Sequence, residues 1–149
     1  MTKLVPYLCT SGAAAAIDFY KTALGAEEQF RMTDDDGKVG HATMTIAGDI
    51  FYLSDEWPEG GVLSPETLGG TPISLHLNVD DVDAAFQQAV AAGATALREP
   101  ADQFYGDRNA TISDPFGHRW MLSKTIEELS TEEMERRVAE AGYATADGG

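Results

Sequence analysis

Two kinds of hydrophobic spacing alternate along the chain, and the same alternation occurs twice. In the first half, Ile17, Tyr20 and Leu24 recur at the spacing of one helix face, and Gly25 follows as a C-terminal cap. In the second half, Asp80-Asp81 offers an N-cap and Gly93 closes the helix that follows. The apolar stripe of this second helix consists of Val82, Ala85, Phe86, Ala89 and Val90. The pattern predicts one amphipathic helix in each half of the chain.

Short apolar runs bounded by turn residues predict the strands. In the first half they fall at Lys3–Cys9, Glu27–Thr33, Gly40–Ile46 and Asp49–Asp55. In the second half they fall at Ile73–Val79, Thr95–Arg98, Ala110–Ser113 and Arg119–Ser123. Turn sequences at 34–37 and 114–117 separate neighbouring strands. Each half is therefore predicted to form one βαβββ unit.

The two units also resemble each other in sequence. Residues 16–26 return as 84–94, and Phe51-Tyr52-Leu53-Ser54 returns as Trp120-Met121-Leu122-Ser123. Two copies of a small unit can bury faces that neither covers alone. We predict an α+β fold with one domain at 1–124, divided into module one (1–57), a linker rich in Gly and Pro (58–71) and module two (72–124).

A tail of different character follows the second module. Ser130 and Glu133 have the spacing of a capping box, and Met134, Val138 and Ala141 make an apolar stripe that Gly142 would end. We therefore predict an accessory helical tail at 125–142, packed on the domain or on a partner subunit. Residues 143–149 are small and polar, and we expect them to be flexible.

Composition excludes several classes of partner. The 149 residues carry 25 acidic and 10 basic side chains, for a net charge of −15, so nucleic acid and anionic membranes are not expected partners. Cys9 is the single cysteine, which fits a reducing compartment. The sequence has neither an apolar run long enough for a membrane span nor a basic segment followed by an apolar signal core. We expect a cytoplasmic protein.

The paired units and two local motifs resemble the vicinal oxygen chelate superfamily, which includes glyoxalase I, extradiol dioxygenases, and fosfomycin and bleomycin resistance proteins. The motifs are the Phe19-Tyr20 helix that ends at Leu24-Gly25 and the turn Asp114-Pro115-Phe116-Gly117-His118. Further segments, among them His41-Ala42, Val79-Asp80-Asp81-Val82-Asp83 and Gln103-Phe104-Tyr105-Gly106-Asp107-Arg108, are similar to its PhnB-like branch. The resemblance covers residues 3–124. It implies a half-open, eight-stranded cleft and a homodimer.

The same resemblance implies where a divalent metal would bind. The four ligand positions of the metal-dependent relatives fall on Val5 or Pro6, on Tyr52, on Ser74 and on Met121. None of these is a histidine or a carboxylate, although divalent transition metals need several such donors. We therefore expect no metal centre of the usual kind and no cofactor.

Three histidines remain as candidates for chemistry. His76 lies two residues after Ser74 on one predicted strand, so both face the cleft, where His76 either takes part in catalysis or binding or makes a hydrogen bond at the cleft edge. For His41, a hydrogen bond to a backbone group is favoured over a catalytic role. His118 has the opposite parity from Met121 and is expected to be structural, facing away from the cleft.

Strand parity also gives a candidate binding set: Tyr7, Tyr52, Ser74, His76, Arg119 and Met121. A phenol, an imidazole, a guanidinium and a thioether suit a small, partly apolar molecule, including an anionic one. For Tyr52 and Met121, simple packing in the core is the alternative. Arg119 is taken as buried, and a buried arginine needs an anionic partner. The loop 103–108 either covers the cleft as a lid or fixes a turn through an Asp107–Arg108 or backbone interaction.

Three functions are consistent with these observations. The first is a small-molecule binding protein without a metal. The second is an isomerase, lyase or dioxygenase with an unconventional site around His76, with His41 as a further candidate. The third is a scaffold in which the dimer surface and the terminal helix matter more than the cleft.

Overall fold

The computed structural model describes residues 1–145 of the chain. Module one comprises β1 (Tyr7–Thr10), α1 (Ala13–Leu24), β2 (Glu27–Thr33), β3 (Val39–Ile46) and β4 (Asp49–Asp55). Module two comprises β5 (Ser74–Asn78), α3 (Val82–Ala92), β6 (Thr95–Asp102), β7 (Asp107–Ser113) and β8 (Arg119–Thr125). The 3₁₀ helix η1 (Pro58–Gly60) and α2 (Pro65–Leu68) lie between the modules, and α4 (Thr131–Glu140) follows them.

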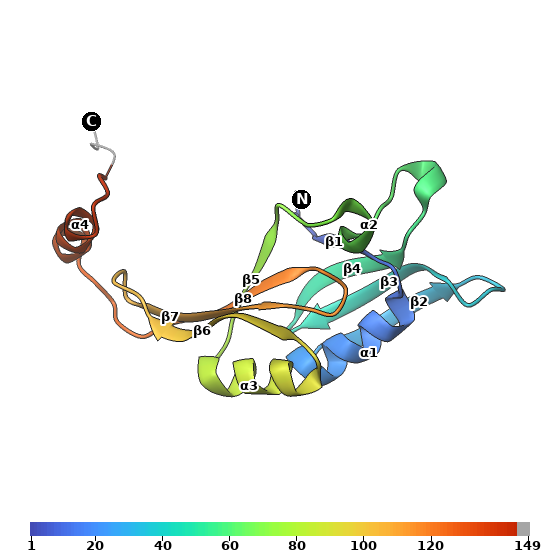
Figure 1. Cartoon of the computed structure of the whole chain (residues 1–149), viewed down its shortest axis with the longest axis horizontal. Helices are drawn as coiled ribbons and strands as arrows, with labels where there is room; N and C mark the ends of the chain where they lie inside the picture. Colours follow the sequence, from blue (N-terminus) through green and yellow to red (C-terminus); the bar gives the residue numbers. More distant parts are fainter. Residues whose placement is uncertain (146–149) are drawn as a thin grey trace.

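The strands form two four-stranded sheets with matching topology. The first sheet has the order β1-β4-β3-β2 and the second the order β5-β8-β7-β6. In each sheet the first and last strands of the module pair in parallel, and the other pairs are antiparallel. The sheets lie side by side along the long axis, with α1 and α3 against the same side of the molecule (Figure 1). The predicted α+β fold with two βαβββ units and a terminal helix is confirmed.

The hydrophobic core lies between the helices and the inner faces of the two sheets. Ile17 and Tyr20 of α1 are fully buried, as the spacing of the first helix predicts. Rings from both modules meet there: Tyr20 lies 5.7 Å from Phe51 of β4 and 5.5 Å from Trp120 of β8, measured between ring centroids. The side chain of Gln88 on α3 also donates to the carbonyl of Thr22 on α1 at 2.8 Å. One continuous core therefore joins the modules.

A buried carboxylate anchors this junction. Oδ2 of Asp114 accepts hydrogen bonds from the Tyr20 hydroxyl at 2.6 Å and from the Trp120 indole N–H at 2.9 Å. Its other oxygen, Oδ1, accepts from the backbone N–H groups of Phe116 and His118 at 2.9 and 3.0 Å. Burial and the neighbouring Asp114 charge hold the pKa of Tyr20 well above its usual value, so this phenol stays protonated as a donor. The sequence identifies Asp114 only as part of the turn at 114–117, so its role as a buried acceptor is a finding of the structure.

A second contact between the modules comes from the same turn. Nε2 of His118 lies 2.8 Å from the carbonyl oxygen of Cys9, so this histidine joins module two to β1, the first strand of module one. The structural role expected for His118 is confirmed.

The observed strand bounds correct several predictions. The first strand begins at Tyr7 rather than Lys3, because its pairing with β4 begins there, where the carbonyl of Pro6 accepts from the N–H of Tyr52. In module two, β6, β7 and β8 are longer than the predicted strands. β6 continues through Pro100 because it is an edge strand with an irregular register, where a missing N–H is tolerated.

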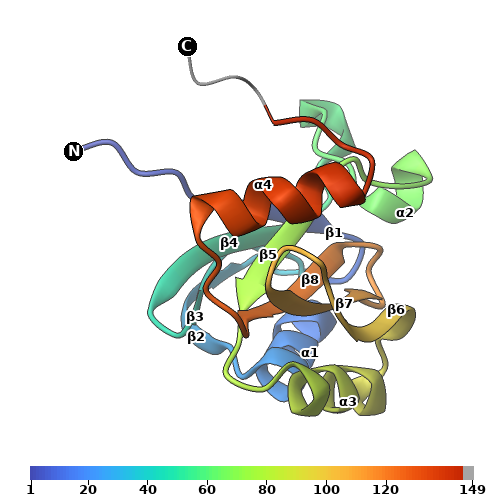
Figure 2. The same ribbon diagram turned by 90° about the vertical axis from the view of Figure 1, so that its left-hand side faces the viewer.

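The terminal helix begins where the capping pattern predicts. Oγ of Ser130 accepts from the N–H of Glu133 at 3.1 Å, and the helix ends at Glu140. α4 stands at one end of the molecule and crosses it beyond the ends of β6 and β7 (Figures 1 and 2). Arg137 holds it there through Glu127 and the carbonyl of Phe104. The predicted flexible end at 143–149 extends outside the described residues.

Replacing Asp114 with Asn tests the importance of this junction. The amide keeps the shape but turns one acceptor into a donor opposite the Tyr20 and Trp120 donors, so we expect a loss of about 2 to 3 kcal/mol in the free energy of unfolding. Urea denaturation measures it. Asp34→Asn is the matched control, because Asp34 accepts from the N–H groups of Asp36 and Lys38 in an exposed turn. An equal loss in both variants contradicts the assignment.

Candidate functional site

The face of the first sheet opposite α1 carries a row of side chains across all four strands. The strand registers align Tyr7 of β1 with Tyr52 of β4, Tyr52 with Thr43 of β3, and Thr43 with Phe30 of β2. Phe30 is brought into this row by a bulge, because the register shifts between Glu28 and Phe30. Tyr7 and Phe30 are both 53% exposed. The row therefore presents aromatic rings to the outside of module one.

His41 of β3 lies among these rings. Its ring centroid is 4.9 Å from that of Tyr52, 5.5 Å from that of Tyr7 and 6.4 Å from that of Phe30. The Tyr7 hydroxyl lies 2.7 Å from Nδ1, and the Thr43 hydroxyl lies 3.1 Å from Nε2. Both ring nitrogens thus bond to side chains, not to the backbone group that the sequence analysis favoured. The result is an aromatic platform, defined here as Tyr7, Phe30, His41 and Tyr52.

The second sheet carries an equivalent row of different chemistry. Its registers align His76 of β5 with Met121 of β8, Met121 with Thr111 of β7, and Thr111 with Arg98 of β6. A register shift between Ala96 and Arg98 places Arg98 opposite Thr111, as the first bulge places Phe30 opposite Thr43. Ser74 and Arg119 form the next pair on the same face.

Comparison of the two rows shows how the copies have diverged. The equivalent pairs, taken along the rows, are Tyr7 and His76, Tyr52 and Met121, Thr43 and Thr111, and Phe30 and Arg98. The threonine is common to both modules, whereas an aromatic ring in module one stands where module two has an arginine. One backbone framework therefore offers an aromatic surface on one sheet and a polar, cationic surface on the other.

The predicted binding residues surround more than one hollow. Tyr7 lines an open hollow of about 1060 Å³ together with Cys9, Ser54 and the start of the linker. Ser74 and His76 line a junction hollow of about 240 Å³ that also includes Pro6 and Phe51 from module one.

A third hollow, of about 230 Å³, lies on module two alone. It is lined by Ser74, Leu97, Arg98, Thr111, Arg119 and Met121. The six predicted residues thus share the outer faces of the two sheets, but they fall into an aromatic group on module one and a polar group on module two.

Three local expectations are corrected. Arg119 is exposed rather than buried, because it follows the turn at the start of β8. The strand partners of Tyr52 and Met121 are Tyr7 and His76, so Val5, Pro6 and Ser74 do not stand opposite them. Arg98 was not among the predicted site residues, because simple alternation along a strand does not reveal the bulge at Leu97.

The loop 103–108 packs against the tail. The carbonyl of Gly106 accepts from the N–H groups of Ile126 and Glu127 at 2.9 and 3.0 Å. Arg108 pairs with Asp83 and Asp102 rather than with Asp107. The turn itself is closed by a backbone hydrogen bond from Gln103 to Asp107, one of the two interactions proposed for it. This loop lines none of the three hollows described above.

The donor groups at the paired positions do not suit a divalent transition metal. Two phenols, one imidazole and one thioether come together as Tyr7 with Tyr52 and His76 with Met121. Such metals require several imidazole, thiolate or carboxylate ligands at one point. In the part of the chain that the structure describes, no three His, Cys, Asp or Glu side chains are grouped closely enough to hold a metal ion. No step through a metal is derived for this site.

The chain belongs to the Glyoxalase/Bleomycin resistance protein/Dioxygenase superfamily, whose family pattern matches residues 4–122. It is 42% identical over 142 residues to uncharacterized protein Mb0911c of Mycobacterium bovis, which covers 93% of each chain. Its fold is similar to that of TioX from Micromonospora sp. ML1, with a TM-score of 0.67 at 23% identity over 84% of this chain and 99% of TioX.

The fold is also similar to that of a PhnB protein from Bacillus cereus. The TM-score is 0.64 at 21% identity, over 83% of this chain and 99% of that protein. At this level of identity the likeness concerns the fold. In the described residues, no helix is long and apolar enough to span a membrane.

Cys9 lies beside the platform in an acidic surrounding. Partial burial, together with the nearby Glu56 and Asp55 carboxylates, raises the pKa of its thiol to about 11. Because the thiolate is the reactive form, this cysteine is expected to be poorly nucleophilic at neutral pH. We assign it no catalytic role.

Alkylation with iodoacetamide tests this electrostatic account. Raising the thiol pKa from 9.0 to about 11 lowers the thiolate fraction at pH 8 roughly 100-fold, so the rate should be about that much below that of a free cysteine and should keep rising with pH beyond 9. Glu56→Gln should shift the pH profile towards lower pH. A profile that levels off near pH 9 contradicts the account.

Proposed function

We propose that this protein binds a small, partly apolar organic molecule on the outer faces of its two sheets, without a metal centre or cofactor. The observation that supports this function best is the aromatic platform. Two of its rings, Tyr7 and Phe30, are each 53% exposed on one sheet face. Rings left uncovered on a soluble domain commonly mark a binding surface, and their flat faces suit stacking with an apolar ligand.

The chemistry of the second row supports a ligand of mixed character. His76, Ser74 and Arg119 supply polar contacts, and Met121 supplies an adaptable apolar one. A ligand that contacts both rows would place an apolar part on module one and a polar part on module two.

We further propose that the protein is a cytoplasmic homodimer. The exposed apolar side chains on both outer faces, including Phe30 and Leu97, would be covered if a second copy faced them. The two groups of binding residues, which line separate hollows in one chain, could then face a single enclosed site. The net charge of −15 argues against nucleic acid and anionic membrane surfaces as partners.

An isomerase, lyase or dioxygenase centred on His76 has less support. His76 is exposed at the junction hollow, whereas the other candidate, His41, lies in module one with both ring nitrogens hydrogen-bonded. The two imidazoles therefore belong to different groups of binding residues. The Tyr7–His41–Thr43 chain of hydrogen bonds is better suited to fixing the platform than to reaching His76.

Replacing Phe30 with Ala tests the platform. Phe30 is exposed on the edge strand β2, so its loss should leave the fold intact while weakening the binding of small aromatic compounds about tenfold. A thermal-shift series with indole, benzyl alcohol and benzoate measures the effect. Phe104→Ala is the matched control, since Phe104 is exposed beside Tyr143 at the tail. If no compound stabilises the wild type, or if the shifts persist in Phe30→Ala, the proposed function fails.

Light scattering after size-exclusion chromatography tests the homodimer. The account predicts a mass about twice 16.0 kDa. A chain that ends at Thr125 shows whether the tail contributes: it should remain dimeric if the sheet faces form the contact, and it should dissociate if α4 forms it. A full-length protein that stays at 16.0 kDa across micromolar concentrations contradicts the proposal.

A further inference from the structure

The arginines of this acidic chain fall into two groups. Four of them, Arg31, Arg108, Arg136 and Arg137, form ion pairs with aspartate or glutamate. Arg98 and Arg119 form none among the residues that the structure describes. With 25 carboxylates in the sequence, partners are abundant. Among the described residues, Arg98 and Arg119 therefore differ from the other four arginines, although carboxylates are abundant in the chain.

These two arginines lie at the same hollow. Arg98 reaches the outer face of β6 because of the bulge at Leu97, and Arg119 stands on the same face at the start of β8. Both line the module-two hollow of about 230 Å³. Two guanidinium groups on one small hollow repel each other unless an anion lies between them, so the arrangement is suited to an anionic occupant.

The other residues that line the hollow indicate which further groups a bound ligand would carry. The side chains of Ser74 and Thr111 bring two hydroxyl groups, which can donate to anionic oxygens. Leu97 and Met121 bring apolar surface to the same hollow. Whole drug-sized ligands fill pockets of about 300 to 1000 Å³, so a hollow of about 230 Å³ suits one functional group and its immediate neighbours.

We propose that Arg98 and Arg119 form a subsite for the anionic group of a small organic acid, with Ser74 and Thr111 as additional donors. The inference rests on the proposed binding function and names its ligand class. A guanidinium pair recognises the planar oxygens of a carboxylate and the oxygens of a phosphate in the same way, through paired N–H donors. The shared chemistry is thus a terminal oxyanion next to an apolar group.

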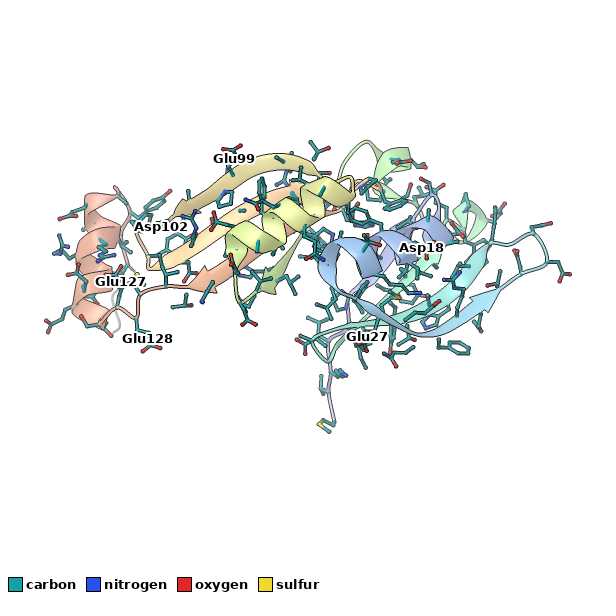
Figure 3. The ribbon with its side chains drawn as sticks, turned by 90° about the horizontal axis from the view of Figure 1, so that it is seen from below. Asp18, Glu27, Glu99, Asp102, Glu127 and Glu128 are labelled. Atoms are coloured by element: carbon teal, nitrogen blue, oxygen red, sulfur yellow. The ribbon has the colours of Figure 1, made fainter. Side chains whose placement is uncertain are left out.

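The surrounding charge makes such a subsite selective. Carboxylates are distributed along the whole molecule, from Asp18 on α1 to Glu127 and Glu128 after β8 (Figure 3). Glu99 and Asp102 also lie on β6, the strand that carries Arg98 (Figure 3). An anion approaching this protein is repelled over most of its surface, and the two guanidinium groups at this hollow offset that repulsion locally.

Calorimetric titration tests the subsite directly. The probes are benzoate, phenyl phosphate, inorganic phosphate and neutral benzyl alcohol, added to the full-length protein at low ionic strength. We expect benzoate to bind at least about tenfold more weakly to Arg98→Gln and to Arg119→Gln than to the wild type, because each variant loses a charge-assisted contact. Benzyl alcohol should bind all variants within twofold of the wild type. Added salt should weaken the binding of the anionic probes and leave that of benzyl alcohol unchanged.

Lys3→Gln is the matched control, since it makes the same change in net charge at an exposed site before β1. Equal melting temperatures of all variants show that folding is preserved. Stronger binding of phenyl phosphate than of benzoate assigns the subsite to phosphate-type ligands, and the reverse order assigns it to carboxylates. If inorganic phosphate binds as tightly as phenyl phosphate, the subsite is assigned to the free anion.

Benzoate binding that is unchanged in both arginine variants overturns the subsite. So does a wild type that binds benzyl alcohol as tightly as benzoate, an outcome that leaves the binding function itself standing. A wild type that binds none of the anionic probes also overturns the subsite. The response of the Phe30→Ala variant to neutral compounds then decides separately whether the proposed binding function fails.

Discussion

The relative placement of the two sheets depends on the hydrogen bonds of one buried carboxylate. Asp114 is 4% exposed, and its two oxygens accept from the side chains of Tyr20 and Trp120 and from two backbone N–H groups. A buried carboxylate is costly unless its oxygens are satisfied, and here each oxygen has two donors. Because Tyr20 belongs to module one and Trp120 to module two, the position of Asp114 fixes one module against the other. The outer faces, which carry the candidate site, inherit this placement.

The duplication provides the second constraint. Each module has the same strand order, the same parallel pairing of its first and last strands, and a bulge at the equivalent place in its edge strand. The two bulges bring Phe30 and Arg98 to equivalent positions. Fixed backbones with different side chains therefore explain how one fold offers an aromatic platform and a cationic hollow. The paired positions carry phenols, an imidazole and a thioether instead of the several imidazole, thiolate or carboxylate donors that a divalent transition metal needs.

Much of the fold could be predicted from sequence because it depends on local patterns. The stripe of Ile17 and Tyr20, the cap at Gly25 and the capping box at Ser130 are all set by neighbouring residues. The PhnB-like motifs then gave the arrangement of the two units. The ends of the strands were predicted less accurately. The first strand begins at Tyr7 and not at Lys3, because its start is set by pairing with β4, which is distant in the sequence.

The candidate site could be predicted only in part. Alternation placed Tyr52, His76 and Met121 together on the side that was expected to face the cleft, but it could not give the register that pairs Tyr7 with Tyr52. It also could not reveal Arg98, whose orientation depends on a bulge, or the four hydrogen bonds of Asp114. The bulge depends on how β6 pairs with β7, and the Tyr20 contact of Asp114 joins residues 94 positions apart, so neither follows from local spacing.

The most direct test of the account is a crystal structure of the full-length protein in complex with benzoate. The account predicts that the carboxylate lies within hydrogen-bonding distance of Arg98 and Arg119, with the ring directed towards apolar side chains of the site. The assembly in the crystal would also show whether rings of a module-one platform complete that site. Benzoate bound elsewhere, with Arg98 and Arg119 paired to carboxylates of the protein, would contradict the claim that the duplicated framework holds an organic acid there.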